Sequence, residues 1–466
     1  MPKIVIIGGG PIGLITGEIL ARDGHSVTIL DRDAAEPRLD ADSDWAAWER
    51  AGVSQFRQPH LIQPKWREVV DREIPGLTGA LIDNGGWRLN LLHGTASDAG
   101  VREQADEWFD AIVVRRPVFE GVLSRFVQEH EGLRVRRGVR VTGLIAAPSS
   151  PGVPRVCGVH TSHGAITADL VVDAGGRRSS VPQWVGAISP IAPREFREDG
   201  GVIYYSRHYK LSSPFISNGL TDLVTQHETL SVLVLPGDNG TVGVALVTSA
   251  RDRRLRGIRE NVTWESLARR IPAAAPWLDS EPLTDVMPMA GIDHVQRSYM
   301  VDGKPTVSGL VAVGDAMVAT NPTLGLGVTL GTLQACVLRD VIAGETEPDL
   351  SAAAERYSDT CEKKLKNHIN MALSYDNHRR VEVGEEIAGA KYRPNGSGWP
   401  TTVALTNGAR LDPLLRRAYV SMSTLFQEST DVLSAQAVQD TLSRYMTGPR
   451  YSIGALGRAE ILEAVS

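Results

Sequence analysis

The sequence predicts an α/β protein in which a Rossmann-like nucleotide-binding domain carries an inserted antiparallel sheet and is followed by a helical region. Three observations predict this fold. A β-branched run meets a glycine-rich turn within residues 3–33, and two further glycine-rich segments occur at 156–180 and 309–331. Apolar strands separated by a turn fill residues 202–248. Residues 346–466 show the apolar spacing of amphipathic helices.

The length and composition are those of a globular protein of two or three domains. The chain has 466 residues, of which 42% are hydrophobic and 22% are charged. The net charge of −6 provides no basic surface for nucleic acid or for an anionic membrane. No apolar run is long enough to span a membrane, and the first one, residues 4–7, is too short for a signal peptide. We therefore expect a cytoplasmic protein with no membrane span and no nucleic-acid partner.

The cysteine and histidine residues give no sign of a disulfide framework or of a metal site. The three cysteines, Cys157, Cys336 and Cys361, are widely spaced and form no C-x-x-C pair. The eleven histidines are scattered. His160 and His163 lie beside a glycine in an apparent hairpin, where a solvated turn is the simpler interpretation. We expect reduced cysteines and no bound metal.

The first glycine-rich stretch has the order of a dinucleotide-binding unit. A buried parallel strand is predicted over Lys3–Ile7 and a helix over Pro11–Arg22. Between them, Gly8, Gly10 and Gly13 fit the pattern G-x-G-x-x-G. The first glycine permits the tight turn, the second lets a diphosphate approach the backbone, and the third lets the helix pack on the strand. The amides and the dipole of the first helical turn would then face the diphosphate.

A second predicted strand, Ser26–Leu30, is followed by Asp31 and completes the strand–helix–strand unit. A carboxylate at this place accepts hydrogen bonds from ribose hydroxyl groups. We predict that both Asp31 and the adjacent Arg32 contact the cofactor. The motif alone does not distinguish FAD from NAD, so the choice depends on the rest of the chain.

The two later glycine-rich segments resemble known flavin-binding motifs. The first runs from the predicted strand Leu170–Val172 into Asp-Ala-Gly-Gly-Arg-Arg-Ser at 173–179. The second runs from another predicted strand into Gly314-Asp315 and the loop Pro-Thr-Leu-Gly-Leu-Gly at 322–327. In this order they resemble the motifs of the flavoprotein monooxygenase and halogenase superfamily, the relatives of para-hydroxybenzoate hydroxylase. The resemblance implies a Rossmann-like FAD-binding domain of the GR2 type.

The resemblance covers residues 1 to about 345 and implies which residues hold FAD. Asp315 would bond a ribityl hydroxyl group; a helix cap is the other interpretation of this residue. Amides near Leu326 and Gly327 would face the N1–C2=O edge of the flavin, where negative charge develops on reduction. The contacts implied by these two motifs are Asp173, Gly175, Gly176, Arg177, Gly314, Asp315, Pro322, Gly325, Leu326 and Gly327.

Three further cofactor contacts follow from the resemblance. Arg116 opens a predicted helix that fits the family's Arg-x-x-Leu-x-x-x-Leu pattern, with Phe119 in place of the first leucine. It would lie near the diphosphate, and a solvated first-turn residue is the alternative. Val141 would offer its backbone to the adenine, and Arg57 lies in a loop like the one that crosses the flavin in relatives. His60 of that loop could act as an acid or base, but a loop histidine is more often only hydrogen-bonded.

Departures from the family's patterns bear on the activity. Ala174 follows the motif aspartate where many hydroxylases have glycine, and the halogenase-like and reductase-like branches share this form. The halogenase signature W-x-W-x-I-P is absent, since the pair Trp45 and Trp48 has another spacing and place. No lysine can be assigned a halogenating role. These absences argue against a halogenase.

The segment between the second and third motifs predicts a sheet that binds the substrate. Strands are predicted within 202–248, around a turn at 236–240. In the family such a sheet roofs the flavin and lines the substrate pocket. Tyr205, Arg207 and Tyr209 alternate along one strand, so they share one face. That face either lines the pocket or points outward.

The predicted division of the chain has three parts. The FAD-binding domain comprises 1–75, 105–185 and 295–345, the substrate-binding domain comprises 76–104 and 186–294, and the C-terminal helical region comprises 346–466. In that last region, apolar residues at helical spacing predict a helix that packs on the domain or on a partner subunit. They are Tyr357, Cys361, Leu365, Ile369 and Ala372.

The resemblance implies an FAD-dependent monooxygenase of secondary metabolism. Such an enzyme hydroxylates or epoxidises an apolar or aromatic small molecule through a flavin C4a-hydroperoxide. The sequence has no second nucleotide-binding glycine motif, so electrons could come from NAD(P)H at the surface or from a partner flavin reductase. A flavin-dependent reductase or dehydrogenase is the first alternative, followed by a halogenase and a non-catalytic flavin-binding protein. The sequence does not identify the substrate, the catalytic residues, the choice between NADH and NADPH, or the oligomeric state.

Overall fold

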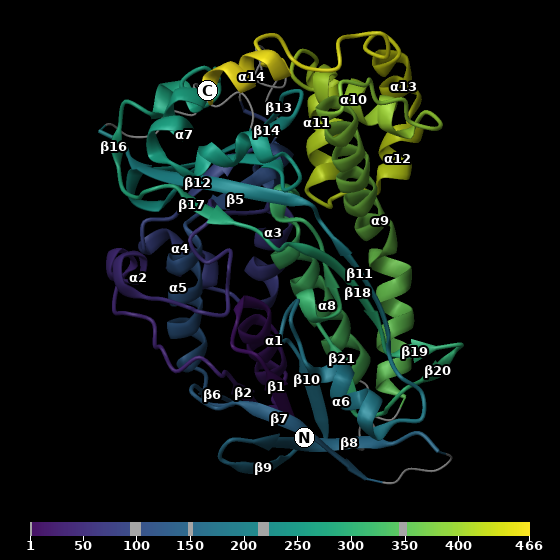
Figure 1. Ribbon diagram of the computed structural model, residues 1–466. Helices are drawn as coiled ribbons and strands as arrows, with labels where there is room; N and C mark the ends of the chain where they lie inside the picture. Colours follow the sequence, from purple (N-terminus) through teal and green to yellow (C-terminus); the bar gives the residue numbers. More distant parts are fainter. Residues whose placement is uncertain (1, 94–103, 148–151, 213–222, 344–351) are drawn as a thin grey trace.

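The computed structural model describes residues 2–93, 104–147, 152–212, 223–343 and 352–466. Figure 1 shows a parallel sheet with its helices in the lower half and an antiparallel sheet in the upper half. The long helix α9 (Ala353–Ile387) runs beside both halves, and further C-terminal helices lie next to the upper sheet. The predicted fold class, with a parallel sheet, an antiparallel sheet and C-terminal helices, is confirmed.

The lower half is built on five parallel strands. They are β1 (Lys3–Ile7), β2 (Ser26–Leu30), β6 (Leu133–Arg136), β10 (Leu170–Asp173) and β21 (Leu310–Ala312). Their order in the sheet is β21-β10-β1-β2-β6, so the first strand of the chain lies in the centre. The middle residues of β1, Ile4, Val5 and Ile6, are apolar and buried because both faces of the sheet are covered.

Helices cover one face of the parallel sheet. These are α1 (Pro11–Arg22), α5 (Arg116–Gln128) and α8 (Gly327–Ile342), which pack against Ile4 and Ile6 of β1 in the largest apolar core. The structure begins and ends α1 where the sequence predicts it. Gly24, with φ of 87°, follows the helix and turns the chain into β2.

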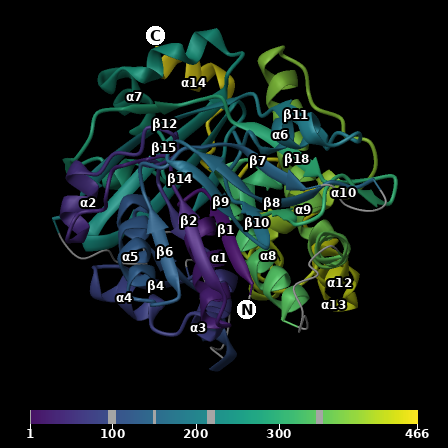
Figure 2. The ribbon, with the colours of Figure 1, turned by 90° about the horizontal axis from the view of Figure 1, so that it is seen from below.

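A small antiparallel sheet covers the opposite face. It consists of β7 (Val141–Ala147), β8 (Arg155–Thr161) and β9 (Gly164–Thr167), and it packs with α6 (Val181–Ile188) against Val5 of β1. Figure 2, seen from below, shows these strands next to β10. The parallel sheet is therefore a middle layer, buried between helices and a second sheet.

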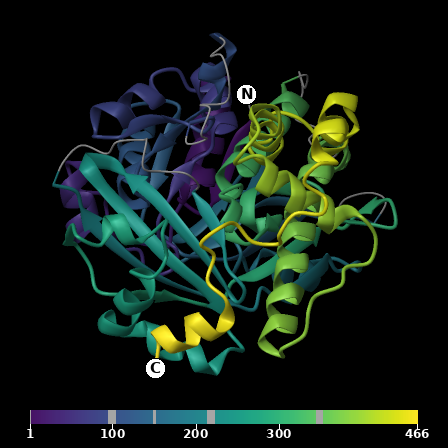
Figure 3. The same cartoon turned by 90° about the horizontal axis from the view of Figure 1, so that it is seen from above.

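The upper half is built on an antiparallel sheet with the order β13-β14-β15-β12-β16, and β17 also pairs with β12. One face packs under α7 (Asn261–Ala268) and α14 (Arg458–Ala464). Figure 3 shows the C-terminal helix α14, in yellow, lying against this upper half. The strands are β12 (Val202–Lys210), β13 (Val224–Gln226), β14 (Leu230–Gly237), β15 (Thr241–Ser249), β16 (Glu281–Pro282) and β17 (Met287–Met289). The predicted turn is confirmed, because β14 pairs with β15 across residues 237–241.

Shorter sheets and helices complete the described chain. The β11–β18–β22 sheet joins the two halves, and β3, β5 and β4 form another small sheet. The strands are β3 (Leu61–Ile62), β4 (Trp87–Asn90), β5 (Asp110–Val113), β11 (Arg194–Asp199), β18 (Asp293–Ser298), β19 (Met300–Val301), β20 (Lys304–Pro305) and β22 (Val318–Ala319). The helices are α2 (Ala41–Ala47), α3 (Pro64–Glu73), α4 (Leu77–Asp83), α10 (Gly398–Gly408), α11 (Pro413–Ser423), α12 (Ser429–Ser434) and α13 (Gln436–Leu442). The 3-10 helices are η1 (Gln104–Phe109), η3 (Asp238–Gly240), η4 (Arg253–Arg259), η5 (Ala275–Trp277), η6 (Gly314–Ala316) and η7 (Pro322–Leu324).

The C-terminal region does not stay apart from the two halves. Tyr357, Cys361 and Leu365 of α9 pack in the core of the parallel sheet, as their spacing predicts. Ile461 of α14 packs in the core of the antiparallel sheet instead. Leu77 of α4, which we assigned to the substrate-binding domain, lies in the core of the parallel sheet. The domain boundaries therefore remain a prediction, and residues 94–103 and 344–351 of those boundaries lie outside the described residues.

Within the described residues, no helix combines the length and the apolar character needed to cross a membrane. In the same part of the chain, no three His, Cys, Asp or Glu side chains gather as a metal ion would require.

Candidate functional site

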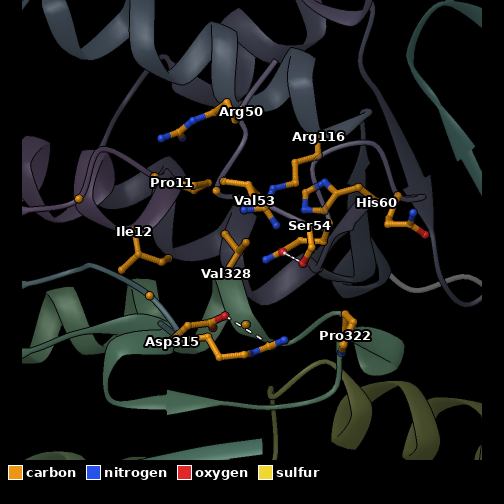
Figure 4. A pocket seen from close by; sticks show the side chains of 18 of the residues that line it. Pro11, Ile12, Arg50, Val53, Ser54, His60, Arg116, Asp315, Pro322 and Val328 are labelled. Carbon is orange, nitrogen blue, oxygen red and sulfur yellow. Dashed lines mark hydrogen bonds and ion pairs between the residues drawn. The ribbon is translucent and has the colours of Figure 1, made fainter. Parts of the chain in front are cut away.

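A cavity of about 1060 Å³ lies between the carboxyl ends of the parallel strands and the inner face of the antiparallel sheet. It is larger than the ~300–1,000 Å³ of ordinary ligand pockets. Figure 4 shows Arg50, Arg116 and His60 on one side of it and Asp315 and Pro322 on the other. Most of the predicted cofactor contacts line it, namely Gly8, Gly10, Asp31, Arg32, Arg116, Val141, Gly175, Gly176, Arg177, Asp315, Pro322, Gly325 and Gly327.

The first glycine turn closes one end of the cavity. Gly8 has φ of 109°, and a Cβ there would stand 2.4 Å from the carbonyl oxygen of Ala174. A Cβ on Gly13 would stand 1.9 Å from the carbonyl oxygen of Gly8, so Gly13 serves the packing of α1 and does not line the cavity. A Cβ on Gly10, by contrast, would meet no atom within 4 Å. The space in front of Gly10 is therefore open, as a diphosphate needs.

A buried arginine organises the end of β2. The Arg50 guanidinium group lies 2.5 Å from Asp31, 2.7 Å from Glu120 and 3.3 Å from Asp33, and it also donates to the Gly9 carbonyl group at 3.2 Å. Its burial disfavours the charged form, but the carboxylates of Glu120 and Asp31 outweigh this and raise the pKa of Arg50. Arg50 lines the cavity, although no sequence motif marks it as a site residue.

Arg116 begins α5 and points into the cavity (Figure 4). Its Nε donates to Glu120 at 2.6 Å. Burial opposes ionisation of Glu120, but Arg116 and Arg50 outweigh it, so the pKa of this carboxyl group is lowered. Two guanidinium groups thus flank one buried carboxylate beside the open turn, and both can reach toward an anion.

Arg57 lies outside the wall of the cavity. Its guanidinium group binds Glu49 at 2.8 Å, the Trp48 carbonyl group at 3.1 Å and the Trp45 carbonyl group. We expected this residue to contact the cofactor, but in the structure its guanidinium group binds residues at and just after the end of α2. Arg50, which follows α2 and precedes the same loop, occupies the cavity wall in its place.

The second motif forms a rigid turn at the end of β10. Asp173 is fully buried and accepts hydrogen bonds from the Gly175 amide at 2.9 Å and from the Ser179 hydroxyl group at 2.7 Å. Burial raises the pKa of Asp173 to about 6. The aspartate therefore holds the turn and does not itself line the cavity. Gly176, with φ of 75°, has open space where a Cβ would stand, and Arg177 donates to the Thr320 carbonyl group at 3.0 Å.

The third motif faces the first across the cavity. The Gly314 amide donates to the Gln334 side chain at 2.6 Å, so Gly314 lies behind the wall, whereas Asp315 lines it. Leu326 is buried and is the N-cap of α8, but it offers no side-chain cap, and Gly327 lines the cavity. The N-cap of α8 therefore gives the first-turn amides no side-chain acceptor, and the contact of the amides near Leu326 and Gly327 with a flavin stays a prediction.

These features fit a dinucleotide cofactor. The N-termini of α1 and α8 both lie at the cavity without a side-chain cap. Helix N-termini attract negative charge, so the first suits a diphosphate and the second suits the edge of a ring that becomes negative on reduction. Because the positions of Gly10 and Gly176 are open, a cofactor could approach the backbone at both glycines.

His60 lies in the cavity beside Arg116 (Figure 4). Its ring stacks on Phe119 with centroids 5.7 Å apart, and Nδ1 lies 3.4 Å from the Val114 carbonyl oxygen. Burial, followed by the charge of Arg116, lowers the pKa of His60 to about 4. The imidazole is therefore neutral near pH 7, and a hydrogen bond from Nδ1 leaves Nε2 as an acceptor.

The far end of the cavity is an apolar chamber. It lies under the antiparallel sheet and against α11, and its polar lining residues are Tyr204, Tyr419, Ser423 and Thr424. Its apolar lining consists of Leu91, Leu223, Val224, Leu233, Leu235, Ala245, Met289 and Val420. A chamber of this composition suits an apolar ligand with a few polar atoms.

The stripe of Tyr205, Arg207 and Tyr209 neither lines the chamber nor faces solvent. Tyr205 and Tyr209 pack with Trp264 of α7 in the core on the opposite face of the sheet. Arg207 donates to the Thr284 carbonyl group at 2.9 Å. Period-two alternation correctly groups these residues on one face, but a covering helix was not among the interpretations we considered.

Comparisons with known proteins show what the chain is similar to. The model of a family described as FAD binding domain matches residues 1–40. "Protein Rv3254" of Mycobacterium tuberculosis is 25% identical over 76% of each chain. "Digeranylgeranylglycerophospholipid reductase 1" of Methanococcoides burtonii is 24% identical over 83% of this chain and 81% of its own. "6-hydroxy-3-succinoylpyridine 3-monooxygenase HspB" of Pseudomonas putida is 24% identical over 73% of this chain and 79% of its own.

Solved structures share the fold. A flavoprotein/dehydrogenase from Cytophaga hutchinsonii superposes with a TM-score of 0.64, at 14% identity over 96% of this chain and 99% of its own. A probable FAD-dependent monooxygenase from Pseudomonas aeruginosa, pqsL, superposes with a TM-score of 0.58, at 16% identity over 82% of this chain and 99% of its own. The overall fold is thus similar in these proteins and in the present chain.

Proposed function

The chain has the fold of the superfamily of FAD-dependent monooxygenases and halogenases, and from this premise we propose that it is an FAD-dependent monooxygenase of an apolar or aromatic small molecule. One observation carries the proposal: the glycine-lined part of the cavity continues into the apolar chamber without a wall between them. A cofactor held in the first part would meet a substrate held in the second.

The residues of the first part are suited to bind and orient FAD. The open turn at Gly10 and the nearby guanidinium groups of Arg50 and Arg116 would hold the diphosphate. The amides at the start of α8 would lie along the ring edge. Bound FAD would supply two-electron transfer and the activation of O₂.

The residues of the second part would bind the substrate and keep water away from it. Leu233, Ala245 and Met289 are each no more than 5% exposed, so a ligand that packs against them would be shielded from solvent. His60 lines the cavity, and its Nε2 would accept a hydrogen bond from a substrate hydroxyl group. This would orient a hydroxylated substrate without the histidine becoming charged.

A flavin-dependent reductase is the second candidate. The relatives named as digeranylgeranylglycerophospholipid reductases and the apolar chamber favour it, because a long apolar chain would fit such a lining. Incorporation of ¹⁸O from ¹⁸O₂ into the product would support the monooxygenase, and its absence with a saturated product would support the reductase. A halogenase or a flavin-binding protein without turnover ranks lower. We also propose that the enzyme acts in the cytoplasm and in secondary metabolism. Identification of the product would test the metabolic role.

The electron donor decides which experiment comes first. Purified protein with FAD should be mixed anaerobically with NADPH and then NADH while the flavin band near ~450 nm is followed. Fast bleaching would support direct use of NAD(P)H. No bleaching, together with tight binding of reduced FAD, would support a partner flavin reductase. No binding of FAD in either oxidation state would contradict the proposal.

A further inference from the structure

Strand β11 (Arg194–Asp199) leaves one edge of the β11–β18–β22 sheet open. It pairs with β18 on one side, and within the described residues no strand pairs with its other side. Figure 1 shows β11 beside β18, between the two halves of the molecule. All six residues of the strand are exposed, and Phe196 in its middle is 56% exposed. An open edge carries N–H and C=O groups to which another strand can bind.

The backbone groups that face the open edge belong to Glu195 and Arg197. On β18, the amide of Arg297 donates at 2.8 Å to the carbonyl oxygen that directly precedes β22, so the backbone of Arg297 faces β22. Successive residues of a strand point their backbone groups to opposite sides, so Gln296 faces β11, where it pairs with Phe196. The backbone of Phe196 therefore faces β18, and those of its two neighbours face outward.

The charges of β11 are complementary to those of a second β11. Two copies related by a two-fold axis pair antiparallel, and the residue at the axis lies opposite itself. With Phe196 at the axis, Arg194 of one copy lies opposite Glu198 of the other. Glu195 lies opposite Arg197 in the same way, so both pairs join opposite charges. The outward-facing backbone groups of Glu195 and Arg197 then meet each other, as an antiparallel ladder requires.

Other registers of the same pairing are disfavoured. Phe196 is the one uncharged residue of the strand, so an axis at any other residue of β11 places a charge directly opposite itself, which destabilises a strand pair. An axis between two residues sets an outward-facing backbone against an inward-facing one, so the ladder cannot form. Charged side chains on an edge often prevent pairing, but this pattern leaves one register favourable.

The charged side chains at the ends of the strand are accessible to a second copy. Arg194 is 63% exposed and lies 2.7 Å from Asp302, and Glu198 is 45% exposed and lies 2.7 Å from Arg380 of α9. Exposed ion pairs of this kind are weak, contributing about 1 kcal/mol or less. Each side chain can therefore exchange or share its present partner when an oppositely charged group arrives on the neighbouring strand.

We propose that β11 is an interaction surface that binds the β11 of a second copy of this chain, with Phe196 at the two-fold axis. The pairing joins the two small sheets into one and brings the two exposed Phe196 rings together, which removes apolar surface from water. Six residues on each side are far fewer than the ~20–30 of a standard interface. The dimer is therefore reversible, and its population rises with protein concentration. The inference depends neither on the cofactor nor on the reaction.

Charge reversal tests the pairing. Sedimentation velocity of the full-length protein between about 1 μM and about 100 μM should show monomers passing into dimers. Arg194→Glu and Glu198→Arg each place like charges opposite one another, so each should raise the dissociation constant of the dimer about tenfold. The double variant restores opposite charges and should return the constant to within about threefold of its original value. Damage to the contacts with Asp302 or Arg380 within one chain would not be repaired in this way.

A disulfide tests the register. Residues opposite each other in a non-hydrogen-bonded antiparallel pair have Cα atoms about 4.5 Å apart, which suits a disulfide. Mild oxidation should therefore convert Phe196→Cys into a covalent dimer. Val262→Cys, at an 82% exposed position of α7, and the unsubstituted protein are the controls and should remain uncrosslinked at the same concentration.

Three outcomes would overturn the inference. A monomer at every concentration would show that the charges of β11 protect the edge from pairing. A double charge variant that dimerises as weakly as the single variants would contradict the pairing of Arg194 with Glu198. Equal crosslinking of Phe196→Cys and Val262→Cys would place the contact between copies elsewhere. None of these outcomes bears on FAD binding, so the proposed function would stand.

Discussion

The guanidinium group of Arg50 lies 2.5 Å from the carboxylate of Asp31, and both side chains are only 5% exposed. Another nitrogen of Arg50 lies 2.7 Å from Glu120 of α5. One arginine thus holds the end of β2 against a helix that arrives much later in the chain. Asp31, which we expected to serve the ribose of the cofactor, already has an ionic partner within the protein.

Replacement of Arg50 should destabilise the protein and weaken FAD binding together. Arg50→Met leaves the Asp31 and Glu120 carboxylates buried without this cation, and loss of one partner of a buried pair costs about 3–5 kcal/mol. Urea unfolding of the apoprotein would measure this loss. Arg72→Met is the control, because Arg72 is 60% exposed and surface ion pairs contribute no more than about 1 kcal/mol. Equal losses in the two variants would contradict the role given to Arg50.

Gly10→Val should abolish retention of FAD without unfolding the protein. A Cβ added here meets no protein atom within 4 Å, and the side chain would occupy the place where the diphosphate would approach. The flavin content after purification and the circular dichroism spectrum would measure the two effects separately. Gly384→Val, at an equally open position of α9, should retain FAD. Normal flavin content in Gly10→Val would refute the assignment of the first glycine motif.

Val224→Trp should block the substrate chamber and spare the cofactor site. Val224 is partly exposed at the chamber, so the larger ring has room to enter it without overpacking the core. The affinity for an apolar substrate should fall about tenfold or more, while the dissociation constant of FAD stays unchanged. Val262→Trp, at an 82% exposed position of α7, should change neither value. Unaltered substrate affinity in Val224→Trp would place the substrate elsewhere.

Acid should destabilise the protein partly through His208. Burial dominates and lowers the pKa of this ring to about 3, so the folded state keeps the ring neutral while the unfolded state protonates it below about pH 6.5. Its contribution to stability is therefore lost as the pH falls, by up to about 1.4 kcal/mol per pH unit. In His208→Asn the free energy of unfolding should fall less steeply between about pH 7 and about pH 5. His163→Asn, at an exposed turn, should keep the original slope.

The parts of the fold that follow local rules could be predicted from the sequence. The β-branched run Lys3–Ile7, the glycine spacing and the stop at Gly24 determine strand, turn and helix within one short stretch, and α1 begins and ends as predicted. The turn between β14 and β15 was found in the same way. In each case the deciding interactions lie between residues close together in the chain.

The parts that depend on tertiary packing could not be predicted. Arg50 lies in an irregular segment after α2, and nothing local distinguishes it from Arg57. What gives it its role are Asp31, Asp33 and Glu120, and Glu120 comes from a distant helix. Likewise, alternation places Tyr205 and Tyr209 on one face of β12, but α7 and α14 determine which face is buried away from the chamber. The return of α14 to the antiparallel sheet left no local signal that we recognised.

Helix α9 has 35 residues and is therefore about 50 Å long if straight. Near its start the Tyr357 hydroxyl group donates to the Ala312 carbonyl group of β21 at 2.9 Å, and farther along Arg379 donates to the Leu230 carbonyl group of β14 at 2.9 Å. One helix is thus hydrogen-bonded to both sheets, and Figure 1 shows it beside both halves of the molecule. An α-helix neither stretches nor shortens easily, so α9 limits how far the parallel and the antiparallel sheet can move relative to each other. Any separation of the two sheets would therefore require α9 to give up its contacts with one of them.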